Sequence, residues 1–411
     1  MTAARHNPDS PTSLRRVVTL PVLVLYAVGV SVGAGIFVLV GRIAGLSGSL
    51  APLAFVLAGV IVAFTAFTFA EFTSRLPHAA GEAAFVEAAF HRRSVTRLVG
   101  LAVAAAATIS AAAIVNGSRA YVQQLIEAPD WTIELFLIAA MTAIAIWGVT
   151  QSMIAMGLVT VIETGTLLWV IIVALTGDAV PAVAPPVAAL PDGSVANLFA
   201  AVLLAIFAFI GFESTVNMAE EVRRPTRTIP IALLVTLAIV ATLYAAVAAA
   251  ALWVASPAEL ATAEAPLALV YRHATGRDGT FLNGLAVCAT VNGVLALLVM
   301  VSRLLYGMAE DGFLPAFLAH VWPRTRTPVP ATLLTAGVVL ILALAAPIEP
   351  LARLTSLVLL LVFATVNAAL LTLKRSGEPV TSDVFHVPIW VPACGVIFSL
   401  LPIAWEVWRL L

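Results

Sequence analysis

The first long apolar stretch of the chain contains three glycines within seven residues, in the segment Gly29-Val30-Ser31-Val32-Gly33-Ala34-Gly35. Glycine lets the backbone leave the helical conformation and lets other groups approach it closely. Unwound backbone is tolerated at membrane depth only where it is buried in protein or lines a water-filled cavity. Amide N–H groups freed at such a break attract an anion, and freed carbonyl groups attract a cation. The segment therefore predicts a binding site for a small ligand carrying both charges, although the same glycines would also serve close helix packing.

A second interruption lies in a later apolar stretch. There the run Phe207-Ala208-Phe209-Ile210-Gly211-Phe212-Glu213-Ser214-Thr215 combines a glycine, a carboxylate and two hydroxyl groups. Transporters built from inverted repeats carry such breaks in pairs near the middle of the bilayer, at the binding site. Because hydropathy places the two breaks in spans one and six, each opens a group of five spans. This spacing predicts a five-plus-five inverted repeat with broken helices 1 and 6.

Glu163 lies well inside another apolar run, in Val161-Ile162-Glu163-Thr164-Gly165. A carboxylate at the centre of a membrane helix costs about 2.5–3.5 kcal/mol on insertion scales, so such a residue is a functional candidate. Desolvation disfavours the charged form, which makes Glu163 the best candidate for a proton carrier. Two alternatives stay open: a Na+ site with hydroxyls such as Thr290 nearby, and a neutral acid in a structural hydrogen bond.

The elements that must position these residues are membrane helices. The chain has 411 residues, of which 62% are apolar and 10% charged, and its mean hydropathy is +1.06. A span needs about 20 mostly apolar residues. Hydropathy predicts an all-α polytopic membrane protein with about eleven spans, near residues 19–43, 48–75, 98–124, 131–149, 152–176, 195–219, 229–255, 281–308, 330–347, 350–373 and 388–410.

The distribution of basic residues predicts the orientation. With the N-terminus inside, 15 of the 21 Lys and Arg residues fall on the cytoplasmic side and 6 outside, as the positive-inside rule requires. We therefore expect a cytoplasmic tail over 1–18, a first repeat over 19–176, an external connector over 177–194, a second repeat over 195–373, and a peripheral helix 11 within 374–411. The pattern that starts at Ser256 predicts a capped external helix, and Glu71 is expected to pair with Arg75, one turn away.

Four patches in order resemble the amino acid, polyamine and organocation transporter superfamily, and the resemblance spans most of the chain. They are Gly33-Ala34-Gly35-Ile36-Phe37, the helix-two exit from Ala70 to Glu82, the stretch from Phe209 through Glu220-Glu221 to Pro230, and Ser302 to Pro315. The chain departs from the family in three places. Alanine replaces one glycine of the helix-two pair, Glu163 stands where some proton-coupled members have lysine, and the usual twelfth span is missing.

The resemblance implies an amino acid permease that works by alternating access. The amides of Gly33, Ala34 and Gly35 would face the substrate carboxylate, and the carbonyls of Ser31, Phe207 and Ile210 its ammonium. Three phenylalanines and Leu297 would wall the cavity. Glu213 would link substrate occupancy to the gate, or would steady the unwound segment through hydrogen bonds. The expected substrate-binding residues are Ser31, Val32, Gly33, Ala34, Gly35, Ile36, Phe207, Ala208, Phe209, Ile210, Gly211, Phe212 and Leu297.

The expected function is secondary transport of an amino acid, a neutral one since no charged side chain is placed for a charged substrate. Transport is expected across a plasma membrane, and the Arg- and Ala-rich composition favours a prokaryotic inner membrane. Coupling would be to H+, less favourably to Na+, or by exchange. No cofactor, catalytic residue, metal site or nucleic-acid partner is expected. A polyamine or organic cation carrier, and a non-transporting amino acid sensor or partner subunit, are the alternatives.

Overall fold

The computed structural model describes residues 18–76, 81–147, 149–177, 195–218, 222–376 and 384–410. Most of the expected tail (1–18), most of the connector (177–194) and Glu220-Glu221 therefore lie outside the described residues. In the described ranges the chain forms helices joined by short links, and the only β pairing there consists of two isolated bridges. This follows from the composition, because backbone groups in hydrocarbon must find hydrogen-bond partners within their own segment.

The first half contains the first broken helix and four further membrane helices. Its elements are α1 (Leu20–Ser31), α2 (Ala34–Ser47), the turn η1 (Gly48–Leu50), α3 (Ala51–Arg75), the short α4 (Gly81–Phe90), α5 (Arg93–Gln123), α6 (Asp130–Trp147) and α7 (Val149–Thr176).

The second half begins with the second broken helix. Its elements are α8 (Val195–Ala208), η3 (Phe212–Met218), α9 (Pro225–Val254), α10 (Pro257–Thr262), α11 (Pro266–Thr275), α12 (Thr280–Glu310), η4 (Ala316–Ala319), α13 (Val329–Ala345), α14 (Ile348–Arg375) and α15 (Trp390–Leu410).

The expected spans correspond to helices in the structure. Nine runs of the described chain are long and apolar enough to cross a membrane, and Leu20–Ser31 and Val329–Ala345 are shorter apolar helices. One of the nine, Gly35–Arg75, joins the second part of span one to span two through η1. The expected capped helix that starts at Ser256 is confirmed as α10, where Ser256 and Glu259 form a capping box.

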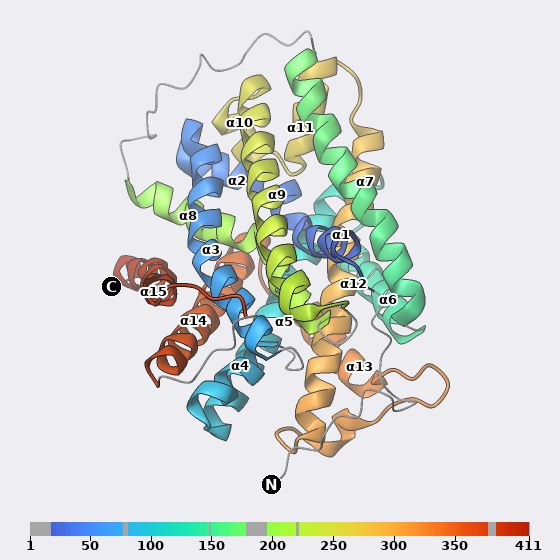
Figure 1. Cartoon of the computed structure of the whole chain (residues 1–411). Coiled ribbons are helices and arrows are strands. Elements are labelled where there is room, and N and C mark those ends of the chain that lie inside the picture. The colour runs from blue at the N-terminus through green and yellow to red at the C-terminus, as the bar shows by residue number, and fades with distance from the viewer. Residues whose placement is uncertain are drawn as a thin grey trace.

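Contacts between the halves follow a regular order. The first broken helix packs against the second (α2 with α8, α1 with η3), α3 packs against α9, and α5 packs against α12. Each of these helices thus contacts the helix that occupies the corresponding place in the other group of five. Figure 1 shows α10 and α11 at the top of the bundle, with α4 at the opposite end. The chain is an all-α polytopic protein of the five-plus-five type.

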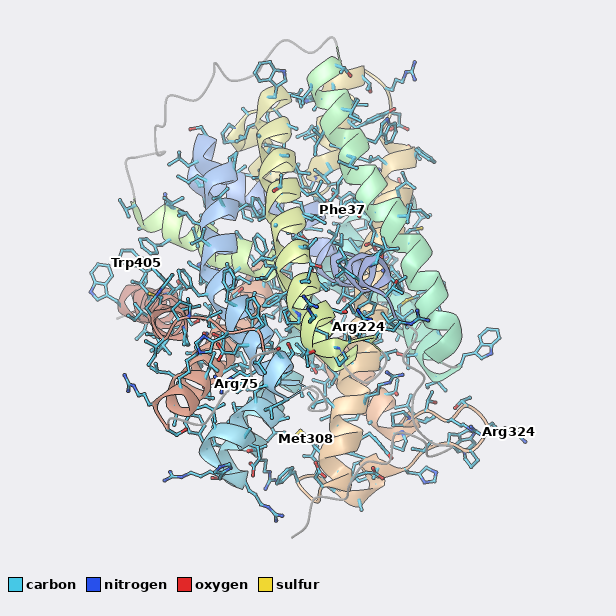
Figure 2. The ribbon with its side chains drawn as sticks, viewed as in Figure 1. Phe37, Arg75, Arg224, Met308, Arg324 and Trp405 are labelled. Carbon is cyan, nitrogen blue, oxygen red and sulfur yellow. The ribbon has the colours of Figure 1, made fainter. Side chains whose placement is uncertain are left out.

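A buried cluster ties α15 to the core at the α4 end. The fully buried Glu71 accepts hydrogen bonds from Arg75 at 2.5 Å, from Lys374 at 2.7 Å and from the Val387 amide at 2.8 Å. The expected pairing of Glu71 with Arg75 is confirmed, and Lys374 also donates to the Val387 carbonyl at 2.6 Å. The cluster holds the segment before α15 against the end of α3. Arg75 is labelled in Figure 2.

The start of α1 is also joined to the segment just before α9. Val18, just before α1, pairs with Val222, just before α9, and the Val18 carbonyl accepts a hydrogen bond of 3.0 Å from the Arg223 amide. Arg224, labelled in Figure 2, then takes a left-handed conformation (φ 52°) at the start of α9. The start of α1 and the entrance to α9 are thereby held together.

Candidate functional site

The first break is two residues long. Helix α1 ends at Ser31, Val32 and Gly33 are extended, and α2 begins at Ala34. No side chain caps the start of α2, so its first amide groups are not satisfied by a capping residue. Free donors and the positive end of the helix dipole both favour an anion at such a terminus. The break therefore presents the donor set that was expected for a carboxylate.

The second break centres on Gly211. Helix α8 ends at Ala208, and Gly211 has φ +123°, a conformation that side chains rarely allow. A Cβ atom at Gly211 would lie only 2.6 Å from the Val30 carbonyl oxygen, so α1 fills the space beside it. The Gly211 carbonyl accepts hydrogen bonds from the Ser214 amide at 3.0 Å and the Ser214 hydroxyl at 2.6 Å. Glycine is thus required here for both its conformation and its lack of a side chain.

The structure brings the two breaks together. A Cβ atom at Gly35 would lie 2.5 Å from the Ala208 Cα atom, which shows that α2 and α8 touch backbone to backbone. The buried Tyr244 hydroxyl of α9 lies 2.7 Å from the Ser31 carbonyl and 3.0 Å from the Ala208 carbonyl, one oxygen from each break. Sequence reasoning missed Tyr244. Its signal was a tyrosine within an apolar helix, because a buried phenol needs a hydrogen-bond partner.

The expected wall residues are buried around the breaks. Val32 and Ile36 are fully buried, and Phe207 and Leu297 are nearly so. The element that carries Leu297, α12, contacts both α1 and α2.

Two of the phenylalanines have clear packing partners. The ring of Phe209 lies 5.4 Å from that of Tyr244, and Phe212 packs between Phe69 and Phe363 at 6.0 and 5.8 Å. Ile210 is only partly buried. Most of the residues at the break are thus buried inside the protein.

Glu163 lies on α7 close to the first break. The side chain is fully buried, and its Oε1 accepts a hydrogen bond of 3.1 Å from Asn292 of α12. Its Oε2 has no partner among the described protein atoms. One turn earlier, Thr160 occupies the space that a side chain at Gly29 would need, so α7 packs tightly against α1. The sequence predicted a buried acid here, and Asn292 is the partner that it did not reveal.

Thr290, the hydroxyl considered for a Na+ site, is also buried on α12. Its hydroxyl donates a hydrogen bond of 3.2 Å to the Val287 carbonyl of its own helix. This is the usual way in which a threonine satisfies its hydroxyl inside a helix.

Glu213 is engaged locally. Its Oε2 accepts a hydrogen bond of 2.9 Å from the Gly211 amide, which braces the turn of the second break. The carboxyl of Glu82, at the start of α4 and outside the membrane-spanning helices, is also buried and interacts electrostatically with Glu213. Burial raises the pKa of the Glu82 carboxyl to about 7, against a smaller lowering by its own backbone amide. The pair joins the second break to α4, and sequence reasoning had given Glu82 no role.

The model of the amino acid permease family matches residues 19–408. The chain is 30% identical over 386 residues to the vacuolar cationic amino acid transporter 2 of Arabidopsis thaliana, covering 88% of this chain and 60% of that protein. It thus spans less than two thirds of that relative.

Two bacterial relatives are matched over most of their length. They are the methylthioribose transporter of Bacillus subtilis (27% identity; 94% of this chain and 86% of the relative) and its branched-chain amino acid permease (26%; 94% and 87%). A family match across nearly the whole chain, on a fold with two adjoining broken helices, confirms the resemblance seen in the four sequence patches. The chain belongs to the amino acid permease family of the amino acid, polyamine and organocation superfamily.

Proposed function

We propose that this protein is a secondary active transporter that moves a neutral α-amino acid across the plasma membrane by alternating access. The observation that carries the proposal is the contact between the two breaks, at Gly35 against Ala208 and at Gly211 against Val30. Two interrupted helices that meet inside a bundle provide opposite backbone charges without an ionised side chain. An α-amino acid carries the two complementary charges about one residue apart.

The substrate carboxylate would bind at the start of α2, on the amides of Gly33, Ala34 and Gly35. Its ammonium would face the carbonyls that end α1 and α8. In the structure the Tyr244 hydroxyl donates a hydrogen bond to the Ser31 carbonyl. We infer that an ammonium group replaces this hydroxyl as the donor to Ser31 when substrate binds.

The substrate side chain would lie among apolar walls. Ile36, Phe207 and Leu297 are buried hydrophobic residues on α2, α8 and α12, and an apolar wall offers no partner to a charged side chain. This supports a neutral substrate. A cationic amino acid is the second candidate, because a cationic amino acid transporter is among the relatives and Glu163 carries an oxygen without a partner.

Glu163 is the proposed proton carrier. It contacts α12 through Asn292 and lies one turn from the contact between α7 and α1. An unpaired buried carboxylate is costly, so a change in the packing of α1 that admits water would change how readily this group holds a proton. Proton release would thus accompany movement of the first broken helix.

Alternating access would use the two repeats, residues 19–176 and 195–373, with the N-terminus inside and helix 11 at the periphery. The paired contacts of α3 with α9 and of α5 with α12 support this division. We infer that the broken helices move relative to these pairs, which opens the buried site to one side at a time.

The proposed function is tested first by binding and then by flux. Thermal unfolding of the purified protein is measured with each of the twenty amino acids and with polyamines. A ligand at 100 times its dissociation constant should stabilise the protein by about 2.7 kcal/mol. Stabilisation by a few neutral amino acids supports the proposal, whereas stabilisation only by lysine, arginine or polyamines contradicts the neutral substrate. If no amino acid stabilises the protein, a non-transporting partner subunit or another substrate class replaces the proposal.

Coupling is tested in proteoliposomes with the stabilising amino acid. Glu163→Gln should abolish the acceleration of uptake by a pH gradient and preserve binding. The matched control is Glu349→Gln, since Glu349 is a partly exposed carboxylate paired with Arg353 away from the breaks. If Glu163→Gln responds to the gradient as the control does, Glu163 is not the proton carrier.

A further inference from the structure

A cavity of about 160 Å3 lies at the α10–α11 end of the bundle, apart from the two breaks. It is enclosed by the end of α5, the link between α10 and α11, α11 itself and the start of α12. By the expected topology this is the external face. Its volume is well below the ~300–1,000 Å3 of clefts that hold drug-sized ligands, so only a small ligand fits.

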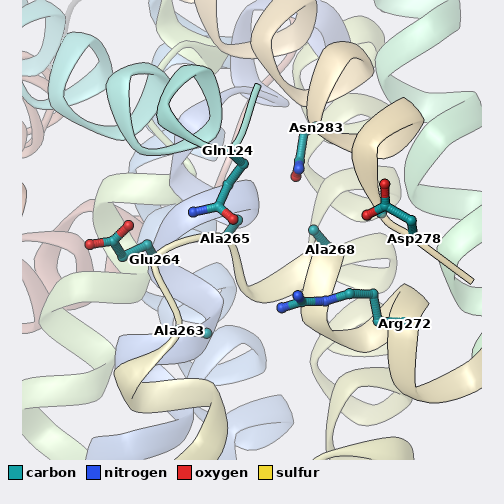
Figure 3. Close-up of a pocket in the computed structure, with 9 residues that line it drawn as sticks. Gln124, Ala263, Glu264, Ala265, Ala268, Arg272, Asp278 and Asn283 are labelled. Carbon is teal, nitrogen blue, oxygen red and sulfur yellow. The ribbon is translucent and has the colours of Figure 1, made fainter. Parts of the chain in front are cut away.

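The polar groups around this cavity carry both charges. Figure 3 shows the Arg272 guanidinium, the Asp278 carboxylate and the amides of Gln124 and Asn283 arranged around it, with the Glu264 carboxylate at its edge and turned away from Arg272. Among the described residues, Arg272, Glu264 and Asp278 take part in none of the ion pairs within 4.0 Å. The Arg272 guanidinium and the Asp278 carboxylate thus line a common space without forming an ion pair with each other.

Asn283 gives an independent sign of a ligand. The residue is only 5% exposed, lines the cavity, and has an Oδ1 atom without a hydrogen-bond partner among the described residues. A buried carbonyl oxygen without a donor is costly, and most such atoms in proteins are satisfied. In Figure 3 the Asn283 amide points toward the space shared with Gln124 and Arg272. A cationic donor in the cavity would satisfy it.

We propose that this external cavity is a second binding site for a small zwitterion, an α-amino acid with a small side chain. The carboxylate binds Arg272 with the Gln124 amide, and the ammonium binds the Asn283 Oδ1 with Asp278. A simple anion would use only the guanidinium, and a simple cation only Asp278 and Asn283. The choice of an amino acid rests on the proposed function, whereas the charges and volume require only a small zwitterion.

The test separates the two sites by blocking the central one. Gly35→Leu places a bulky side chain against Ala208 and should remove central binding. We expect alanine to bind the wild-type protein at two sites by isothermal titration calorimetry, and to bind Gly35→Leu at one weaker site. Adding Arg272→Gln to Gly35→Leu should weaken that remaining binding at least tenfold. The matched control is Arg277→Gln, an exposed arginine just after α11 that does not line the cavity, and it should leave binding unchanged.

A second measurement does not depend on the folding of Gly35→Leu. Ala263→Cys introduces a thiol at the cavity wall of a chain whose two native cysteines are replaced by alanine. Alanine should slow its labelling by a small impermeant thiol reagent at least threefold, and Arg272→Gln should remove this protection. Equal protection by acetate alone or by methylammonium alone would overturn the zwitterion site, as would no protection by alanine. If wild-type protein binds one alanine and Ala263→Cys is not protected, this site is refuted while the central site stands.

Discussion

Gly35→Ala tests the contact on which the central site depends. The added Cβ atom would lie 2.5 Å from the Ala208 Cα atom and 2.8 Å from its Cβ atom. Carbon atoms pack best about 3.5–4.0 Å apart, so the α8 backbone would have to move away by about 1 Å. Overpacking of this kind lowers the free energy of unfolding by about 1–3 kcal/mol. Because both atoms at Ala208 belong to or adjoin the backbone, no rotamer change can relieve the contact.

The assay is the midpoint of thermal unfolding of the purified protein, together with amino acid binding. Gly307→Ala is the matched control, since Gly307 also lies inside a membrane helix and a Cβ atom there would meet nothing within 4 Å. Gly35→Ala should unfold at a lower temperature than wild type and bind substrate more weakly, whereas Gly307→Ala should do neither. Equal unfolding temperatures for the two variants would refute the claim that α2 and α8 touch without room for a methyl group.

Three further predictions concern buried polar groups. Tyr244→Phe removes the hydroxyl donor that joins the two breaks, so we expect the free energy of unfolding to fall by about 0.5–1.5 kcal/mol. Substrate affinity in binding assays should change as well. If neither the free energy of unfolding nor the affinity changes, the hydroxyl has no role. Glu71→Ala leaves Lys374 buried without its carboxylate partner and should lower the free energy of unfolding by about 3–5 kcal/mol, measured by thermal unfolding. A decrease as small as that for an exposed ion pair would contradict the buried cluster. Burial raises the pKa of the Glu82 carboxyl to about 7 in the folded state, from 4.5 for an unburied glutamate. The folded state therefore binds this proton more tightly than the unfolded state. The contribution of Glu82 to the free energy of unfolding should therefore be fully present below pH 4.5 and fall by up to about 3 kcal/mol as the pH rises through 7. Glu82→Gln should flatten this slope, and an equal slope in both proteins would assign it to other groups.

The membrane helices could be predicted from hydropathy because hydrocarbon leaves an apolar segment few alternatives to a helix. The two breaks were also predictable, since glycine and polar residues in the middle of such segments are costly unless they serve a purpose. The boundary between the first two spans was less clear, because α2, η1 and α3 form one continuous apolar run.

The partners of the polar residues could not be predicted in the same way. Glu163 stood out as a buried acid, but the sequence contains no local signal that Asn292, on a different helix, would be its partner. The same holds for Tyr244, whose contacts depend on how α9 packs against both breaks. Such pairs are set by tertiary packing between segments far apart in the chain, whereas spans and caps are set by residues close together.

The hydrogen bond between the Arg223 amide and the Val18 carbonyl offers a natural label for movement. It is a main-chain bond that connects the start of α1 to the entrance of α9. If α1 swings away from η3, this bond must break, and the Arg223 amide hydrogen then becomes available to exchange with deuterium from the solvent. The rate of exchange at this one position would report how often the protein opens, with no dye or engineered cysteine attached.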